Sequence, residues 1–76
     1  MRAAKSHEHL QPNDPPLRII YRNYRGEISE RAIVPINVYF GATEYHPEPQ
    51  WLMHALDVAK GETRDFALRD FQKILT

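Results

Sequence analysis

The chain has 76 residues and no cysteine, and its ten basic residues are balanced by ten acidic ones. A chain of this length folds as one small domain with a single core, and the absence of cysteine excludes a disulfide framework and a thiolate metal site. A formal net charge of zero gives no overall attraction for a polyanion, so nucleic-acid binding would depend on local clusters of cations.

Residues 1–16 are expected to form a flexible N-terminal arm, because they combine charged residues and prolines with few apolar groups. This segment also lacks the apolar region of a signal peptide, and no part of the chain approaches the roughly 18 apolar residues of a membrane span. We therefore expect a cytoplasmic protein without a membrane segment, whose folded domain covers residues 17–76.

Alternating apolar residues predict a first strand over residues 17–24. Leu17, Ile19 and Tyr21 share one face of this segment, which is the period-two pattern of a half-buried strand. Gly26 follows within a short polar segment, and glycine supplies the positive φ that a tight hairpin requires. The next strand is therefore expected to pair antiparallel with the first.

A second long strand is expected over residues 28–40. Pro35 interrupts it and cannot donate to a β-ladder, so the segment forms either two strands or one strand bent at a bulge. The following loop, residues 41–50, carries Glu44, His46 and Glu48. These side chains superficially resemble a metal-binding set, but such a combination arises easily in a polar loop, and we predict a solvated loop and no metal.

Residues 50–58 hold the only tryptophan and read as a central strand around which the chain is organised. Neither face of the alternation is polar enough to face water, so burial on both faces is expected. One face carries Trp51, Met53 and Ala55, and the other carries Leu52, His54, Leu56 and Val58. A small core on both sides of one strand implies a strongly bent sheet or barrel.

The C-terminal part begins with a turn at residues 60–62, followed by a short strand over residues 63–68. Leu68, Phe71 and Leu75 then fall at helical spacing. This spacing predicts that residues 67–75 close the domain as a helical turn.

No group of residues in the sequence indicates catalysis. A nucleophile with a base, or a pair of carboxylates on one rigid face, is not evident, and His54 within an apolar strand is more often a core histidine than a base. The three glycines are isolated turn residues and do not form a phosphate-binding loop. We predict a protein that is not an enzyme and uses no cofactor.

Four segments resemble a known family: LRIIYRNYRG from residue 17, RAIVP from residue 31, WLM from residue 51 and RDFALRD from residue 64. In this order and spacing, they are similar to the WYL domain. The resemblance implies a small, mainly β, SH3-like or Sm-like barrel of about five strands, which agrees with the bent sheet expected above. The tripeptide departs from the family pattern, since Leu52 and Met53 stand in place of Tyr and Leu.

The resemblance also implies a function. WYL domains usually accompany a DNA-binding domain in bacterial or phage-associated transcription regulators, where they act as ligand-sensing modules for single-stranded nucleic acid or nucleotides. The 76 residues are expected to hold the barrel alone. Carried over by position, the ligand-binding candidates are Arg31, Trp51 and Arg64, joined by Tyr21 and Arg69.

Each candidate also has a structural alternative. Trp51 and Tyr21 suit a core equally well, and Arg31 and Arg64 suit cross-strand ion pairs with neighbours such as Glu30. The alternative function is therefore a structural or protein-interaction module, a homodimer or a partner-binding domain that uses exposed strand edges. Arginines that converge beside an exposed aromatic residue favour ligand binding, and arginines that are each paired with a carboxylate favour the alternative.

Overall fold

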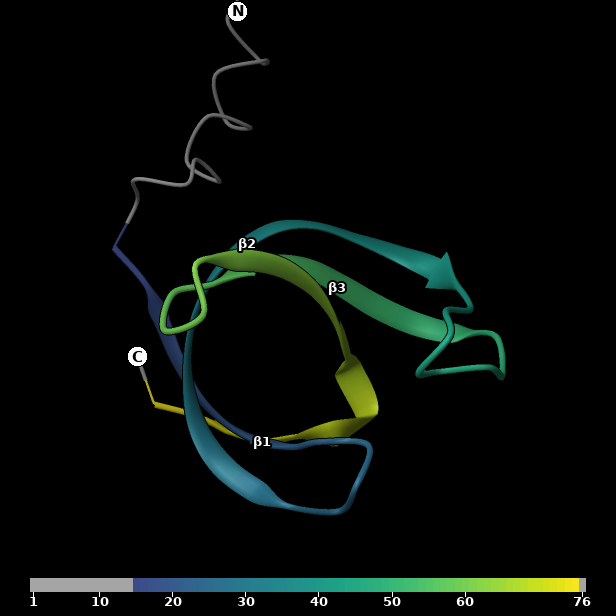
Figure 1. Cartoon of the computed structure of the whole chain (residues 1–76), viewed down its shortest axis with the longest axis horizontal. Coiled ribbons are helices and arrows are strands. Elements are labelled where there is room, and N and C mark those ends of the chain that lie inside the picture. The colour runs from purple at the N-terminus through teal and green to yellow at the C-terminus, as the bar shows by residue number, and fades with distance from the viewer. Residues whose placement is uncertain (1–14, 76) are drawn as a thin grey trace, which may run out of the picture.

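The computed structural model describes residues 15–75, so most of the predicted N-terminal arm lies outside the described part of the chain. The elements are β1 (Leu17–Arg22), β2 (Ile28–Gly41), β3 (Gln50–Asp57), β4 (Glu62–Ala67), the 3-10 turn η2 (Leu68–Asp70) and β5 (Phe71–Ile74). The strands form one antiparallel sheet in the order β4-β3-β2-β1-β5. Figure 1 shows the sheet curled into a ring, with η2 joining the two edge strands. The predicted small, mainly β barrel with a helical turn near the C-terminus is confirmed.

The β1–β2 hairpin forms where the sequence predicts it. Gly26 has a φ of 85°, a value at which a side chain would be strained. Asn23 closes the turn, because its backbone N–H donates to the carbonyl of Glu27 at 2.8 Å. Its side-chain oxygen also accepts hydrogen bonds from the backbone N–H groups of Arg25 and Glu27, both at 2.9 Å. Tyr24 belongs to this turn and not to the predicted first strand.

Strand β2 is continuous but bulged, which confirms the expected bend. Pro35 lies opposite Ala55 and Asn37 lies opposite His54, so Ile36 is the extra residue. The order of strands makes β2 the centre of the sheet, with β3 beside it. The prediction that residues 50–58 form the central strand is therefore wrong in its position, although β3 itself spans nearly the predicted residues.

The core lies inside the curl of the sheet. Its main cluster consists of Ile19, Tyr21, Ile33, Ala55 and Phe66, with Leu17, Met53 and Phe71 packed against it, and Val34, Leu52 and Ala67 are also buried. The ring of Tyr21 meets the rings of Phe66 and Phe71 edge-on, with centroids 5.0 and 5.7 Å apart. Its hydroxyl accepts a hydrogen bond from the backbone N–H of Ala67 at 2.8 Å. Because β1 and β4 are not neighbours in the sheet, this bond holds the curl closed.

The C-terminal helical turn is shorter than predicted, since only Leu68–Asp70 is helical and Phe71–Ile74 forms β5. In β5, Ile74 pairs with Ile19 and Phe71 pairs with Tyr21. Pairing satisfies the backbone of an otherwise open edge of β1 and places the Phe71 ring against Tyr21. The strand pairing and aromatic contacts of this short segment therefore stabilise a strand more than its apolar spacing would stabilise a helix.

Burial along β3 differs from the expectation at its start. Leu52, Ala55 and Asp57 are buried, whereas Trp51 is 56% exposed. Strand β4 pairs with β3 only from Leu52 to Asp57, so Trp51 lies beyond the end of that neighbour. Within residues 15–75, no helix is long and apolar enough to cross a membrane.

Candidate functional site

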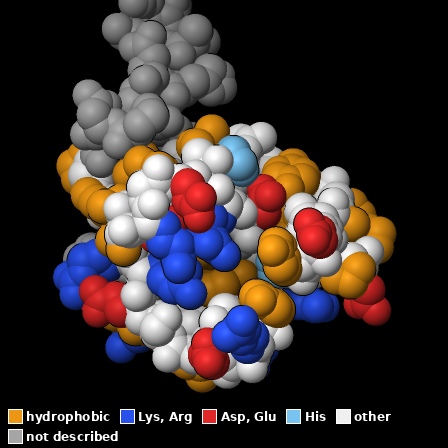
Figure 2. Space-filling model, viewed as in Figure 1, with side chains coloured by type: hydrophobic (Ala, Val, Ile, Leu, Met, Phe, Trp, Pro, Cys, Tyr) orange, Lys and Arg blue, Asp and Glu red, His pale blue; other side chains and the backbone are white. Residues whose placement is uncertain are grey.

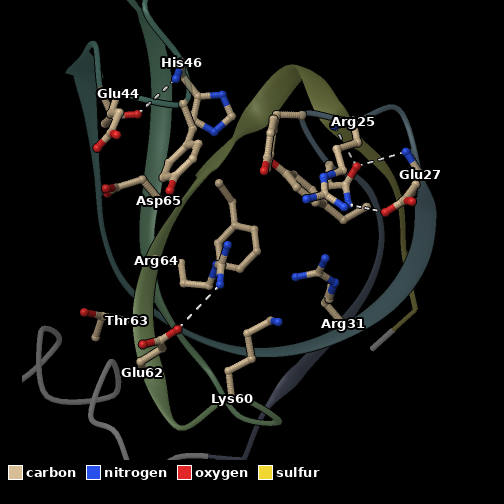
Figure 3. A pocket seen from close by; sticks show the side chains of 16 residues that line it. Arg25, Glu27, Arg31, Glu44, His46, Lys60, Glu62, Thr63, Arg64 and Asp65 are labelled. Carbon is tan, nitrogen blue, oxygen red and sulfur yellow. Dashed lines mark hydrogen bonds and ion pairs between the residues drawn. The ribbon is translucent and has the colours of Figure 1, made fainter.

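A hollow of about 770 Å³ opens on the inner side of the curled sheet. The β1–β2 turn, β2, the β2–β3 loop, the β3–β4 turn and β4 all contribute to its wall (Figure 3). We refer to it as the central hollow. Its charged lining residues are Arg25, Arg31, Lys60, Arg64, Glu27, Glu44, Glu62 and Asp65. The formal charges balance, so the chemistry of the hollow depends on which of them are already engaged.

Three cations from different segments point into the central hollow. Figure 3 shows the charged ends of Arg31, Lys60 and Arg64 turned toward its middle. They come from β2, the β3–β4 turn and β4 respectively. Figure 2 shows Lys and Arg side chains gathered near the middle of this face, with Asp and Glu side chains beside them.

Arg31 is held in place by a buried carboxylate. Its Nη1 lies 3.2 Å from Oδ2 of Asp57, whose side chain is 1% exposed. The Nε of Arg31 also donates to the Ser29 hydroxyl at 3.2 Å. Within residues 15–75, Oδ1 of Asp57 has no hydrogen-bond partner. Arg31 therefore compensates a buried charge, and this structural task limits how far it can serve a ligand.

Arg64 and Lys60 are held more loosely. Nη1 of Arg64 lies 3.6 Å from Oε2 of Glu62, and both side chains are substantially exposed. Exposed ion pairs of this kind contribute about 0–1 kcal/mol and are screened by salt. Lys60 forms no ion pair with another residue of the described chain. These two cations are available to an anionic ligand, as is Arg25, which also lines the hollow and forms no ion pair with another residue of the described chain.

Two of the acidic lining residues are engaged by groups other than the three cations. Asp65 accepts a hydrogen bond from the Tyr39 hydroxyl at 2.8 Å and lies 3.0 Å from Nδ1 of His54. Desolvation, together with the hydrogen bond to Asp65, raises the pKa of Tyr39 above its ordinary value. Glu27 accepts a hydrogen bond from the Asn23 amide at 3.0 Å.

An exposed aromatic pair lies at the same hollow. The rings of Tyr24 and Tyr45 have centroids 5.1 Å apart and planes tilted by 42°. Both side chains line the hollow and remain more than half exposed. The guanidinium of Arg25 lies 5.7 Å from the centroid of the Tyr24 ring. Exposed aromatic faces of this kind suit stacking with a planar ring.

The structure brings three of the five predicted ligand-binding residues to the central hollow. Arg31, Arg64 and Tyr21 line it, but Tyr21 is 4% exposed and belongs to the core. Trp51 does not line it and packs edge-on against Phe40 instead, with ring centroids 5.5 Å apart. Arg69 lines a second depression of about 480 Å³.

Sequence reasoning missed four residues of the site: Tyr24, Tyr45, Asp57 and Lys60. Tyr24 is the last residue of the first predicted strand, Lys60 belongs to a predicted turn, and Asp57 is one residue of a predicted apolar strand. Tyr45 carried a signal, because an exposed aromatic residue in a polar loop is often functional.

No group of three or more His, Cys, Asp and Glu side chains in the described residues is placed to hold a metal ion. Comparison with family models, curated proteins and solved structures finds no match to this chain.

Proposed function

We propose that the chain is a non-catalytic binding module that holds single-stranded nucleic acid or a nucleotide in the central hollow. The observation that carries this proposal is the convergence of Arg31, Lys60 and Arg64 beside the exposed Tyr24–Tyr45 pair. Guanidinium and ammonium groups bind phosphate, and aromatic faces stack bases with little dependence on sequence. The proposal includes a role in transcriptional regulation, as in the WYL domains that the sequence resembles.

The charge balance of the hollow sets the expected mode of binding. Glu62 and Glu44 lie among the lining residues, so an incoming phosphate competes with carboxylates for the cations. Few phosphate contacts are therefore expected, so affinity should fall only moderately as salt increases, and stacking on the tyrosines is expected to carry a large share of the affinity.

The test is a titration of the full chain against a fluorescently labelled single-stranded oligonucleotide at two salt concentrations. The double variant Lys60→Ala, Arg64→Ala is expected to bind more weakly than the wild type at low salt, because it removes two loosely held cations. Arg18→Ala is the matched control: Arg18 pairs with Glu30, and neither residue lines the hollow. Absence of wild-type binding at low salt, or equal binding by the double variant, would contradict the proposal.

The second candidate function is a protein-interaction module. It is favoured by a different observation, the exposed apolar side chains of Val38, Phe40 and Trp51 at the shared end of β2 and β3.

A further inference from the structure

An apolar patch lies at the far end of the β2–β3 pair, and none of its residues lines the central hollow. Phe40 and Trp51 are directly opposite in register, and their rings meet edge-on at 5.5 Å. Val38 lies two residues before Phe40 and therefore on the same face. The three side chains are 57%, 56% and 47% exposed, in the order Phe40, Trp51 and Val38. We refer to these three residues as the aromatic patch.

The patch is exposed because β2 and β3 extend past their neighbours. Strand β1 pairs with β2 only at residues 28–33, and β4 pairs with β3 only from Leu52. Figure 1 shows the far ends of β2 and β3 projecting together beyond the ring of strands. Met53 lies opposite Val38 and packs against the core. The aromatic patch therefore continues the core outward onto the surface.

The charge of this region indicates the kind of partner that fits it. Residues 34–41 and 50–56 contain no Asp, Glu, Lys or Arg, although 26% of the chain is charged. Exposed strands usually carry charges that prevent association with other chains. A strongly charged partner would find no complementary group along these two segments, whereas a second copy of the chain offers the same neutral, apolar surface.

We propose that two copies of this chain associate through the aromatic patch, packed face to face about a twofold axis. Such a contact is isologous, so Phe40 and Trp51 of each copy are covered by the same residues of the other. A fully buried aromatic side chain covers about 150–250 Å², and stable interfaces bury about 1,200–2,000 Å² in total. Two partly exposed aromatic residues and a valine from each copy supply less than that, so the dimer is weak and depends on concentration.

The dimer does not rest on the nucleic-acid binding proposed above; it gives the second candidate function, a protein-interaction module, a specific partner. None of the three patch residues lines the central hollow. Ligand binding and association therefore depend on different side chains, and a failure of nucleotide binding says nothing about the dimer.

Sedimentation velocity over a concentration series of the full chain tests the dimer. The mass is expected to rise from the 8.9 kDa of one chain toward twice that value. Trp51 is the only tryptophan, so its fluorescence reports on the patch alone and is expected to shift to shorter wavelength over the same concentrations. Val38→Lys places a charge in the patch and is expected to keep the chain monomeric, with Trp51 emission independent of concentration.

Ile74→Lys is the matched control. Ile74 is 62% exposed on β5, outside the patch, and this variant is expected to associate like the wild type. If Val38→Lys loses the β-sheet circular dichroism signal, Phe40→Ser replaces it in the comparison. The proposal is overturned if the wild type stays at 8.9 kDa at every concentration reached. It is equally overturned if the folded patch variant associates like the wild type, or if Ile74→Lys is just as monomeric.

Discussion

Arg31 and Asp57 form an ion pair that joins β2 to the end of β3, with Nη1 3.2 Å from Oδ2. The Asp57 side chain is 1% exposed and that of Arg31 is 18% exposed, so the pair is removed from most of the solvent. Removing one partner from a buried pair leaves an uncompensated charge, whereas replacing both partners with apolar residues can be neutral or stabilising. This asymmetry makes the pair testable.

Arg31→Ala is expected to lower the free energy of unfolding by about 3–5 kcal/mol, because it leaves the buried Asp57 carboxylate without its ion-pair partner. That is a large part of the stability of a small domain. The double variant Arg31→Met, Asp57→Leu is expected to recover most of the loss. Urea unfolding followed by circular dichroism measures both. Arg18→Ala breaks an exposed pair with Glu30 and should cost less than about 1 kcal/mol. Equal losses in Arg31→Ala and Arg18→Ala would show that Asp57 does not depend on Arg31.

Trp51→Ala is expected to leave the domain folded. The indole is 56% exposed and packs edge-on against Phe40, so its removal should cost about 1 kcal/mol. Leu52→Ala, at the neighbouring fully buried position, should cost about 2–5 kcal/mol. Urea unfolding of both variants separates the two cases. A larger loss for Trp51→Ala than for Leu52→Ala would place the indole in the core after all.

Local patterns predicted the elements of this fold better than its assembly. The alternation of Leu17, Ile19 and Tyr21 identified the inner face of β1, and Gly26 and Pro35 marked the hairpin and the bulge. Each of these signals depends only on the backbone of a few consecutive residues. The order of strands in the sheet depends instead on contacts between distant segments, so local patterns could not show that β2 is the central strand.

The site was predicted only in part, because it is created by the curl of the sheet. Arg31 and Arg64 were candidates from the family resemblance, and both line the hollow. Lys60 and Tyr45 lie in a turn and a loop, whose direction local patterns do not specify. Trp51 is exposed because β4 pairs with β3 only from Leu52 onward, and residues 50–58 alone do not specify how far the neighbouring strand extends.

Alkaline pH is expected to destabilise the domain through Tyr21. Burial raises the pKa of its hydroxyl above the ordinary value of 10.0, the hydrogen bond from Ala67 acting in the opposite sense. Because the folded-state pKa is the higher one, this contribution is fully present below about pH 10 and is lost as pH rises through the folded pKa. The loss approaches about 1.4 kcal/mol per pH unit for one tyrosine.

Urea unfolding of the wild type and Tyr21→Phe between about pH 8 and pH 11 measures this dependence. The variant should be less stable at neutral pH, because the buried N–H of Ala67 loses its acceptor, but its stability should fall less steeply at high pH. Tyr39, whose pKa is also raised, is unchanged in both proteins and contributes to the slope of each. Identical slopes would exclude Tyr21 as the titrating group.

The last prediction separates the cations of the central hollow from its tyrosines. Each phosphate contact releases counterions, so Lys60→Ala and Arg64→Ala are each expected to lower the salt dependence of oligonucleotide affinity by about one unit. Tyr24→Ala removes a stacking surface and no charge. It should therefore cost about 1–3 kcal/mol of binding at every salt concentration, with the slope unchanged.

The measurement is the dissociation constant of a labelled oligonucleotide over a salt series, with Arg18→Ala as the variant that removes one cation outside the hollow. Arg31 is left intact in all of these proteins. Its loss would destabilise the domain through Asp57, and an effect on ligand affinity could not then be separated from an effect on folding. Equal reductions in the salt dependence of affinity for Arg18→Ala and Lys60→Ala would mean that the oligonucleotide responds to the total charge of the protein and does not bind specifically at the hollow. A normal affinity in Tyr24→Ala would remove the aromatic pair from the site and leave a purely electrostatic contact.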